Sequence, residues 1–111
     1  MAITTSVRDG VSIVALEGKL AAGGLAPFST VQGLLDRGVT QIVLDLEGVD
    51  FMDSSGLGEL TRAEQAVRSR GATLTLAALS ANVRRTMSAA GLIKEFQIFD
   101  DEIDALASFR G

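Results

Sequence analysis

The sequence predicts a single α/β domain, spanning residues 1–111, with a mostly parallel sheet. After an N-terminal hairpin, strand-like and helix-like segments alternate along the chain, which is typical of parallel strands joined by right-handed crossovers. The 111 residues suit one domain, and hydrophobic residues at 47% against charged residues at 22% indicate a packed core. We therefore expect a mixed sheet of four to five strands with about four helices.

The N-terminal third is expected to form the hairpin and the first helix. Asp9-Gly10 is a two-residue turn signal between two short β-like runs, and residues 11–16 are predicted to form the second strand. After a loop rich in glycine and alanine, a helix is expected to begin near Pro27, because proline suits the first helical turn. Apolar residues then recur at helical spacing until Gly38, which fits a helix stop.

The middle of the chain contains the segment QIVLDL, residues 41–46. Its nearly continuous hydrophobicity predicts a strand that is buried on both faces. A polar connection is expected over residues 47–58. An apolar stripe at helical spacing follows over residues 57–67, and Arg70-Gly71 is expected to close that helix.

The C-terminal segments continue the alternation. The run ATLTLAAL, residues 72–79, predicts a strand, and SANVRRTMSAAGL, residues 80–92, predicts a capped helix that stops at its glycine. The run EFQIF, residues 95–99, predicts a short strand. DDEIDALASF, residues 100–109, predicts a last helix, because acidic residues in a first turn complement the helix dipole. The expected order is β-β-α-β-α-β-α-β-α.

Three connections are expected to share one edge of the sheet. Each leads from a strand into a helix, and such connections emerge at the carboxyl ends of their strands. In open α/β sheets that edge is where ligands and partners bind. The connections are residues 20–24, 47–58 and 79–82.

Composition excludes several classes of chemistry. The chain has no cysteine and no histidine, which removes thiol catalysis, the usual general base and the commonest metal ligands. Its net charge of −4 is a poor match for a nucleic-acid backbone. The N-terminus does not resemble a signal peptide, and no apolar run approaches the ~18 residues of a membrane span. We expect a cytoplasmic protein that is not an enzyme, with no metal, no cofactor, no nucleic-acid partner and no membrane insertion.

The stretch DFMDSSGLGEL, residues 50–60, is the main functional candidate. A hydrolase elbow needs Gly-x-Ser-x-Gly and a base, whereas Met52 lies two residues before Ser54 and histidine is lacking. A dinucleotide fingerprint would need a third glycine where Thr61 stands, and no Gly-Lys-Ser/Thr supports a P-loop. The structural alternative is a helix cap, since Asp and Ser are preferred there. Whether the apolar pair Phe51 and Met52 belongs to the core or to an interface is left open.

A cap alone does not explain the two glycines of this stretch. Gly56 and Gly58 would each weaken a helix interior, so they are expected to bring the backbone close to a neighbouring loop, a partner or a modifying enzyme. A phosphorylated serine fits such a turn, because helix N-terminal N–H groups stabilise a phosphate. The added charge would repel a partner near Asp53 and Glu59. The residues alone do not separate Ser54 from Ser55 as acceptor.

The stretch VDFMDSSGLGEL resembles the phosphorylation motif of the anti-sigma factor antagonist family of STAS domains. QIVLDL before it and SANVRRTMSAAGLIKEFQIFDDEIDAL after it extend the resemblance over almost the whole chain. The resemblance implies a STAS-like fold and a regulator. The unmodified protein would bind an anti-sigma factor, often itself a serine kinase, and so free a sigma factor. The kinase would phosphorylate the serine and release the complex, and a serine phosphatase would reset it.

The resemblance also implies a site. The phosphoacceptor would be Ser54, with Ser55 as the alternative, and Asp53 would orient or recognise it. The partner-binding residues implied are Leu20, Ala21, Gly23, Gly24, Asp53, Ser54, Ser55, Gly56, Leu57, Gly58, Ser80 and Asn82.

The chain departs from the family at the end of its second strand. Many members carry Gly-Glu-Leu-Asp there, whereas this chain has Gly18-Lys19-Leu20-Ala21, so an acidic pair is lost and a cation gained. The departure leaves open a STAS scaffold, such as a stressosome-like component, or a subunit of a lipid-transport complex. A small nucleotide-binding domain is the rival from another class. The chain is expected to be a monomer or a weak dimer.

Overall fold

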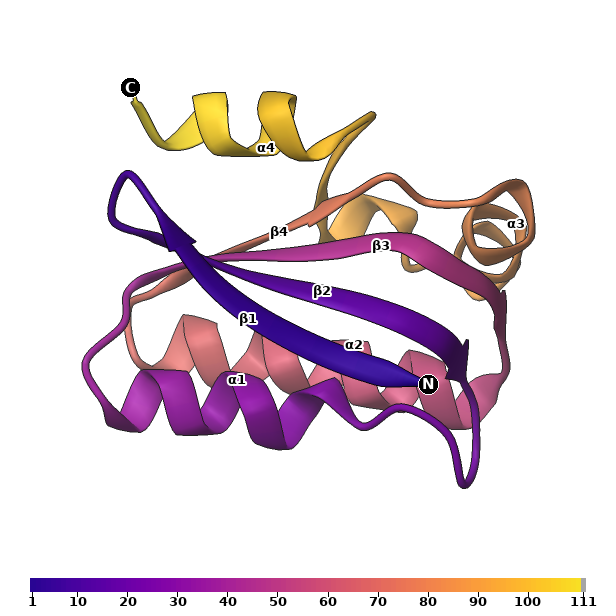
Figure 1. Ribbon diagram of the computed structural model, residues 1–111. Coiled ribbons are helices and arrows are strands. Elements are labelled where there is room, and N and C mark those ends of the chain that lie inside the picture. Colours follow the sequence, from indigo (N-terminus) through magenta and orange to yellow (C-terminus); the bar gives the residue numbers. More distant parts are fainter. Residues whose placement is uncertain (111) are drawn as a thin grey trace.

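Five strands form one mixed sheet in the order β1-β2-β3-β4-β5 (Figure 1). β1 pairs antiparallel with β2, and the remaining neighbours pair parallel. The predicted fold class and element order are confirmed. In the computed structural model, which describes residues 1–110, the elements are β1 (Ala2–Arg8), β2 (Val11–Leu20), α1 (Pro27–Asp36), β3 (Gln41–Met52), α2 (Ser54–Ser69), β4 (Thr73–Ala77), α3 (Ala81–Ala89), the 3₁₀ turn η1 (Ile93–Glu95), β5 (Gln97–Phe99), α4 (Glu102–Ala107) and the 3₁₀ turn η2 (Ser108–Arg110).

The two faces of the sheet are covered unequally. Figure 1 shows α1 and α2 side by side below the sheet, with α4 above it. The main core lies between the sheet and α1, α2 and α3, which contribute the buried residues Val31, Leu34, Leu35, Leu60, Ala63, Val67, Val83 and Met87. A smaller core lies beneath α4 and consists of Val11, Ile13, Val43, Ala77, Ala105 and Leu106. The main core therefore supports the helices that begin at the carboxyl edge.

β3 is the central strand, and its first half is buried on both faces. Ile42, Leu44 and Leu46 belong to the main core, whereas Val43 belongs to the smaller core. Successive side chains of a strand point to opposite faces, so this alternation places β3 between the helical layers. Burying each such side chain contributes roughly 1.5–3 kcal/mol. The two-sided burial predicted for residues 41–46 is confirmed.

β2 and β3 are longer than the sequence predicted. β2 continues from Leu16 to Leu20, and β3 continues from Leu46 to Met52, so the predicted connection over residues 47–58 is wrong. The reason is two register shifts, each of which inserts one extra residue on β3. Such bulges twist a strand locally, and here they return Val49 and Met52 to the main core. The exposed residues Glu47, Gly48, Asp50 and Phe51 interrupt the apolar run and concealed the strand.

The short C-terminal elements differ from the predicted ones only in their bounds. The predicted strand over residues 95–99 begins at Gln97, because η1 precedes it. The predicted helix over residues 100–109 is α4 followed by η2, and the side chain of Asp101 caps it by accepting from the backbone N–H of Asp104 at 2.8 Å.

The Thr75 hydroxyl on β4 is fully buried and has no hydrogen-bond partner among residues 1–110. A buried hydroxyl without a partner costs roughly 1–3 kcal/mol. We expect Thr75→Val, which keeps the side-chain shape, to raise the free energy of unfolding by about 1 kcal/mol in chemical denaturation. Thr73→Val on the same strand is the control, because Thr73 is half-buried and should change stability by less than about 0.5 kcal/mol. Destabilisation by Thr75→Val would mean that the Thr75 hydroxyl does have a hydrogen-bond partner.

Candidate functional site

The ends of β2 and β3 are joined where α2 begins. The connection between β3 and α2 consists of Asp53 alone. Its backbone N–H donates to the carbonyl of Leu20 at 3.1 Å, and its carboxylate accepts from the backbone N–H of Ala22 at 3.4 Å. The predicted meeting of these two connections at the carboxyl edge is confirmed.

The third connection joins the same edge from the other side. Asn82 donates from its side-chain amide to the carbonyl of Asp50 at 3.2 Å, which ties the start of α3 to the end of β3. Ser80 caps α3, because its hydroxyl accepts from the backbone N–H of Val83 at 3.2 Å. All three predicted connections therefore converge on the last residues of β3.

Asp53 is the N-cap of α2. Its carboxylate accepts from the backbone N–H groups of Ser55 at 2.9 Å and Gly56 at 3.1 Å. The bond from Gly56, with those from Ala22 and Ser55, lowers the pKa of Asp53 below its ordinary value, so this carboxylate is ionised at neutral pH. The cap explains Asp53 and leaves the hydroxyls of Ser54 and Ser55 exposed. It also takes two of the N–H groups that the sequence had assigned to a phosphate.

The two glycines of the motif have different surroundings. Gly56 is buried, and a Cβ at this position would collide with the backbone carbonyl group of Leu20. The close neighbour expected from sequence is therefore the end of β2. Gly58 is different, because a Cβ there would make only an ordinary contact of 3.5 Å with an Arg62 guanidinium nitrogen.

A shallow hollow of about 290 Å³ lies beside the two serines. It contains six of the residues that sequence had placed in the site. Glu59 and Arg62 also line it, and sequence reasoning gave them no role in a hollow. The only feature of the sequence that could have placed Arg62 near the serines is its spacing of seven residues, about two helical turns, from Ser55. The lining residues are Ala21, Ala22, Gly23, Gly24, Leu25, Ala26, Ser54, Ser55, Gly58, Glu59 and Arg62.

Some predicted contact residues lie below the surface or outside the hollow. Leu20 and Gly56 are buried, and Leu57 is half-buried against the main core, so these three support the site from beneath. Ser80 and Asn82 do not line the hollow, and they flank the end of β3 instead.

The question left open for the apolar pair before the motif is answered by burial. Met52 is 4% exposed and belongs to the core, whereas Phe51 is 45% exposed. The ammonium of Lys19 lies 5.8 Å from the centroid of the Phe51 ring, because the two residues are register partners on β2 and β3. The cation at the end of β2 is therefore held beside an exposed aromatic ring.

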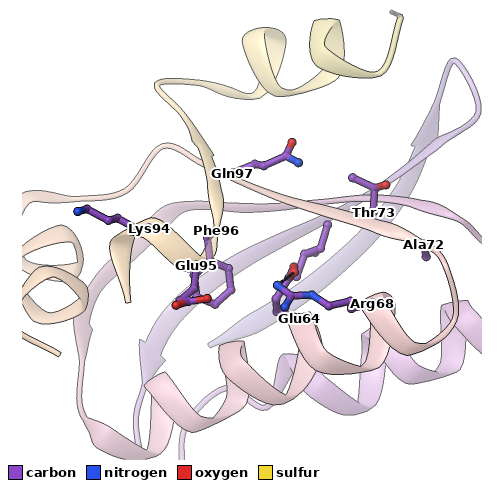
Figure 2. A pocket seen from close by; sticks show the side chains of 9 residues that line it. Glu64, Arg68, Ala72, Thr73, Lys94, Glu95, Phe96 and Gln97 are labelled. Carbon is purple, nitrogen blue, oxygen red and sulfur yellow. Dashed lines mark hydrogen bonds and ion pairs between the residues drawn. The ribbon is translucent and has the colours of Figure 1, made fainter. Parts of the chain in front are cut away.

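A second hollow of about 310 Å³ lies elsewhere, between α2 and the η1–β5 segment (Figure 2). Figure 2 shows Phe96 directed toward α2 and Lys94 directed away from it. Glu64 pairs with Arg68 at 3.1 Å on its helical wall, and partial burial raises the pKa of Glu64. None of the site residues predicted from sequence lines this hollow.

Within residues 1–110 no three acidic side chains lie close enough together to hold a metal ion. No helix in that part of the chain is both long and apolar enough to cross a membrane. What the geometry offers is two exposed hydroxyls, an ionised carboxylate and one nearby guanidinium.

The mixed sheet with its Asp-Ser-Ser start of α2 defines a STAS-type domain. A family model of the STAS domain matches residues 2–105. The anti-sigma F factor antagonist of Paenibacillus polymyxa is 31% identical over 99 residues, which cover 87% of this chain and 85% of that protein. The chain belongs to the STAS domain family.

Solved structures agree on the fold. The anti-sigma factor antagonist from Mycobacterium paratuberculosis gives a TM-score of 0.83 at 23% identity and covers 99% of this chain and 94% of its own. The Bacillus cell fate determinant SpoIIAA in its phosphorylated form gives a TM-score of 0.74 at 20% identity, with coverage of 97% and 99%. At these identities the two structures are evidence for the fold alone.

Proposed function

We propose that this chain is an anti-sigma factor antagonist whose binding is switched off by phosphorylation of Ser54. The unmodified chain binds an anti-sigma factor, and the sigma factor held by that protein is released. The chain acts in the cytoplasm and by binding rather than by catalysis. A serine-protein kinase and a serine phosphatase supply the covalent chemistry in trans.

The observation that carries the proposal is the position of Ser54. Its hydroxyl is exposed on the first residue of a helix whose start is fixed by the Asp53 cap. A fixed, exposed hydroxyl at the carboxyl edge suits both a docking surface and the active site of a kinase. The naming of the Paenibacillus relative supports the same function.

The switch follows from charge. A phosphoserine adds about −1.5 to −2 charges at neutral pH. These charges would lie beside Asp53, which is already ionised, and near Glu59 in the same hollow. A partner docked on this edge would meet like charge and would have to strip water from the phosphate. Binding would weaken while the core, which lies beneath α2, stays unchanged.

The test is a pull-down from cell extract with wild type, Ser54→Ala and Ser54→Asp as baits, read by mass spectrometry for partners and phosphosites. We expect an anti-sigma factor, in many cases also an ATP-dependent kinase, to bind wild type and Ser54→Ala but not Ser54→Asp. Wild type should carry phosphate on Ser54. The matching baits Ser55→Ala and Ser55→Asp show which hydroxyl is the switch.

The proposal fails if all baits retain the same partners and neither serine is ever modified. A scaffold or transport subunit would behave in that way. Saturable binding of a nucleotide to the purified chain, weakened by Ser54→Ala, would instead favour the ligand-binding alternative.

A further inference from the structure

Arg62 lies against the surface of α2 and is directed toward the start of that helix. Its guanidinium pairs with the Glu59 carboxylate at 2.5 Å and lies 5.5 Å from the centroid of the Phe28 ring. One of its nitrogens lies 3.5 Å from the place where a Cβ on Gly58 would be. Gly58 and Glu59 precede Arg62 on the helix, so the guanidinium lies back toward the two serines.

The surroundings of Arg62 fix its guanidinium at the hollow. The other oxygen of Glu59 accepts from the backbone N–H of Phe28 at 3.0 Å, so the carboxylate is held between α1 and α2. The side chain of Glu59 is only 17% exposed, whereas that of Arg62 is 53% exposed. Arg62 is also the one cation among the residues that line the hollow, each of which lies within the described part of the chain.

A phosphate on this turn would need such a cation. The carboxylate of Asp53 already occupies the N–H groups of Ser55 and Gly56, so the start of the helix is not itself a free anion site. Asp53 and Glu59 would both repel the phosphate. Arg62 is exposed enough to exchange one carboxylate partner for a phosphate, a group that guanidinium binds in a bidentate manner.

Helix geometry ranks the two serines. Arg62 follows Ser55 by seven residues, so the two lie about 20° apart around the helix and about 10 Å apart along it. It follows Ser54 by eight residues, which places them about 80° apart. Long side chains on a helix point toward its N-terminus, which brings the guanidinium toward Ser55.

We propose that Arg62 is an intramolecular phosphate ligand of the Asp-Ser-Ser turn: it leaves Glu59 and pairs with a phosphate on this turn, most closely with one on Ser55. The proposal rests on the proposed function in that a phosphate is placed on this turn. The proposed acceptor is Ser54, and the alternative acceptor Ser55 is the serine that lies nearer to Arg62. It assigns Arg62 to the modified state of the chain.

The test uses the full chain with phosphoserine incorporated during translation at position 55 and, separately, at position 54. The pH titration of the phosphoserine phosphate is followed by ³¹P NMR at low ionic strength. It is measured in the chain with no other change, in Arg62→Gln and in Arg68→Gln. Arg68 is a matched control, because it pairs with Glu64 on the same helix and does not line the hollow.

We expect Arg62→Gln to raise the second pKa of the phosphate on position 55, normally about 6, by about half a unit, or about threefold in proton affinity. The shift should be smaller at position 54 and should shrink in high salt. Arg68→Gln should leave both values unchanged.

The proposal is overturned if neither phosphate responds to Arg62→Gln, or if Arg68→Gln has the same effect. This readout needs no kinase and no partner, so its failure can be told apart from a failure of the proposed function. If the pKa of the phosphate responds to Arg62→Gln but the phosphorylated chain keeps its partners, the proposed function alone is contradicted.

Discussion

Replacing Gly56 with alanine is expected to destabilise the fold by roughly 3 kcal/mol or more. The new Cβ would collide with the Leu20 carbonyl group, whose carbon would lie only 2.6 Å away. Both groups belong to backbone that is held by hydrogen bonds, because the Leu20 carbonyl accepts from Asp53 and the N–H of Gly56 donates to the Asp53 side chain. Neither can move without breaking the start of α2, and overpacking of this kind is among the costliest single changes.

Gly58→Ala is the matched control for Gly56→Ala. It lies two residues along the same helix, and its Cβ would meet only the flexible end of Arg62. Because alanine favours a helix interior over glycine, Gly58→Ala should stabilise the chain by up to about 1 kcal/mol. Thermal and urea denaturation of both variants measure the difference. Equal effects at the two positions would mean that the packing of α2 on β2 is looser than described.

The pair of glycines shows where sequence reasoning ends. Gly56 and Gly58 look alike in the sequence, and both were predicted to bring the backbone close to something. Only the fold shows that Gly56 meets Leu20, which lies 36 residues earlier in the chain, and that Gly58 meets a side chain of its own helix. Contacts between distant segments depend on how the strands are paired, and spacing along the chain does not contain that information.

Local patterns did predict the architecture. The apolar run of residues 41–46 identified the central strand because two-sided burial leaves a continuous apolar signature. The same rule missed residues 47–52, where two bulges place Val49 and Met52 in the core at intervals of three. A period of three matches neither a regular strand nor a helix, so this part of β3 resembled a loop.

The candidate site was predicted in part for the same reason. Asp53, Ser54 and Ser55 form a contiguous motif, and contiguous motifs are visible in a sequence. The pairing of Glu59 with the Phe28 backbone joins α1 to α2, and neither residue signals the other. From sequence, Glu59 was expected only to add negative charge near the serines, whereas its carboxylate also accepts from the backbone N–H of Phe28 on α1.

Phe51→Ala is expected to weaken binding of the anti-sigma partner by about 30-fold or more, which corresponds to about 2 kcal/mol. Phe51 is the large apolar residue that remains 45% exposed at the end of β3, three residues before Ser54. Aromatic residues of this kind dominate the binding energy of protein interfaces. Titration calorimetry with the partner identified by pull-down measures the change.

The stability of the free chain should hardly change in this variant. Phe51 is exposed, and its contact with the ammonium of Lys19 is a surface cation–π contact worth roughly 0.5–1 kcal/mol. A loss of affinity would therefore arise at the interface. Val7→Ala is the control, because Val7 is 71% exposed on β1, next to the hairpin turn at the opposite end of the sheet.

Equal losses in Phe51→Ala and Val7→Ala, or no loss in either, would place the interface elsewhere. A loss confined to Phe51 would extend the docking surface from the serine turn onto the strand that precedes it. Lys19→Glu then becomes informative, because it replaces the cation beside Phe51 with an acidic charge. If the cation selects the partner, Lys19→Glu should weaken binding in the same assay even though Phe51 is unchanged. The charge at the end of β2 would then be the feature that sets this chain's choice of partner.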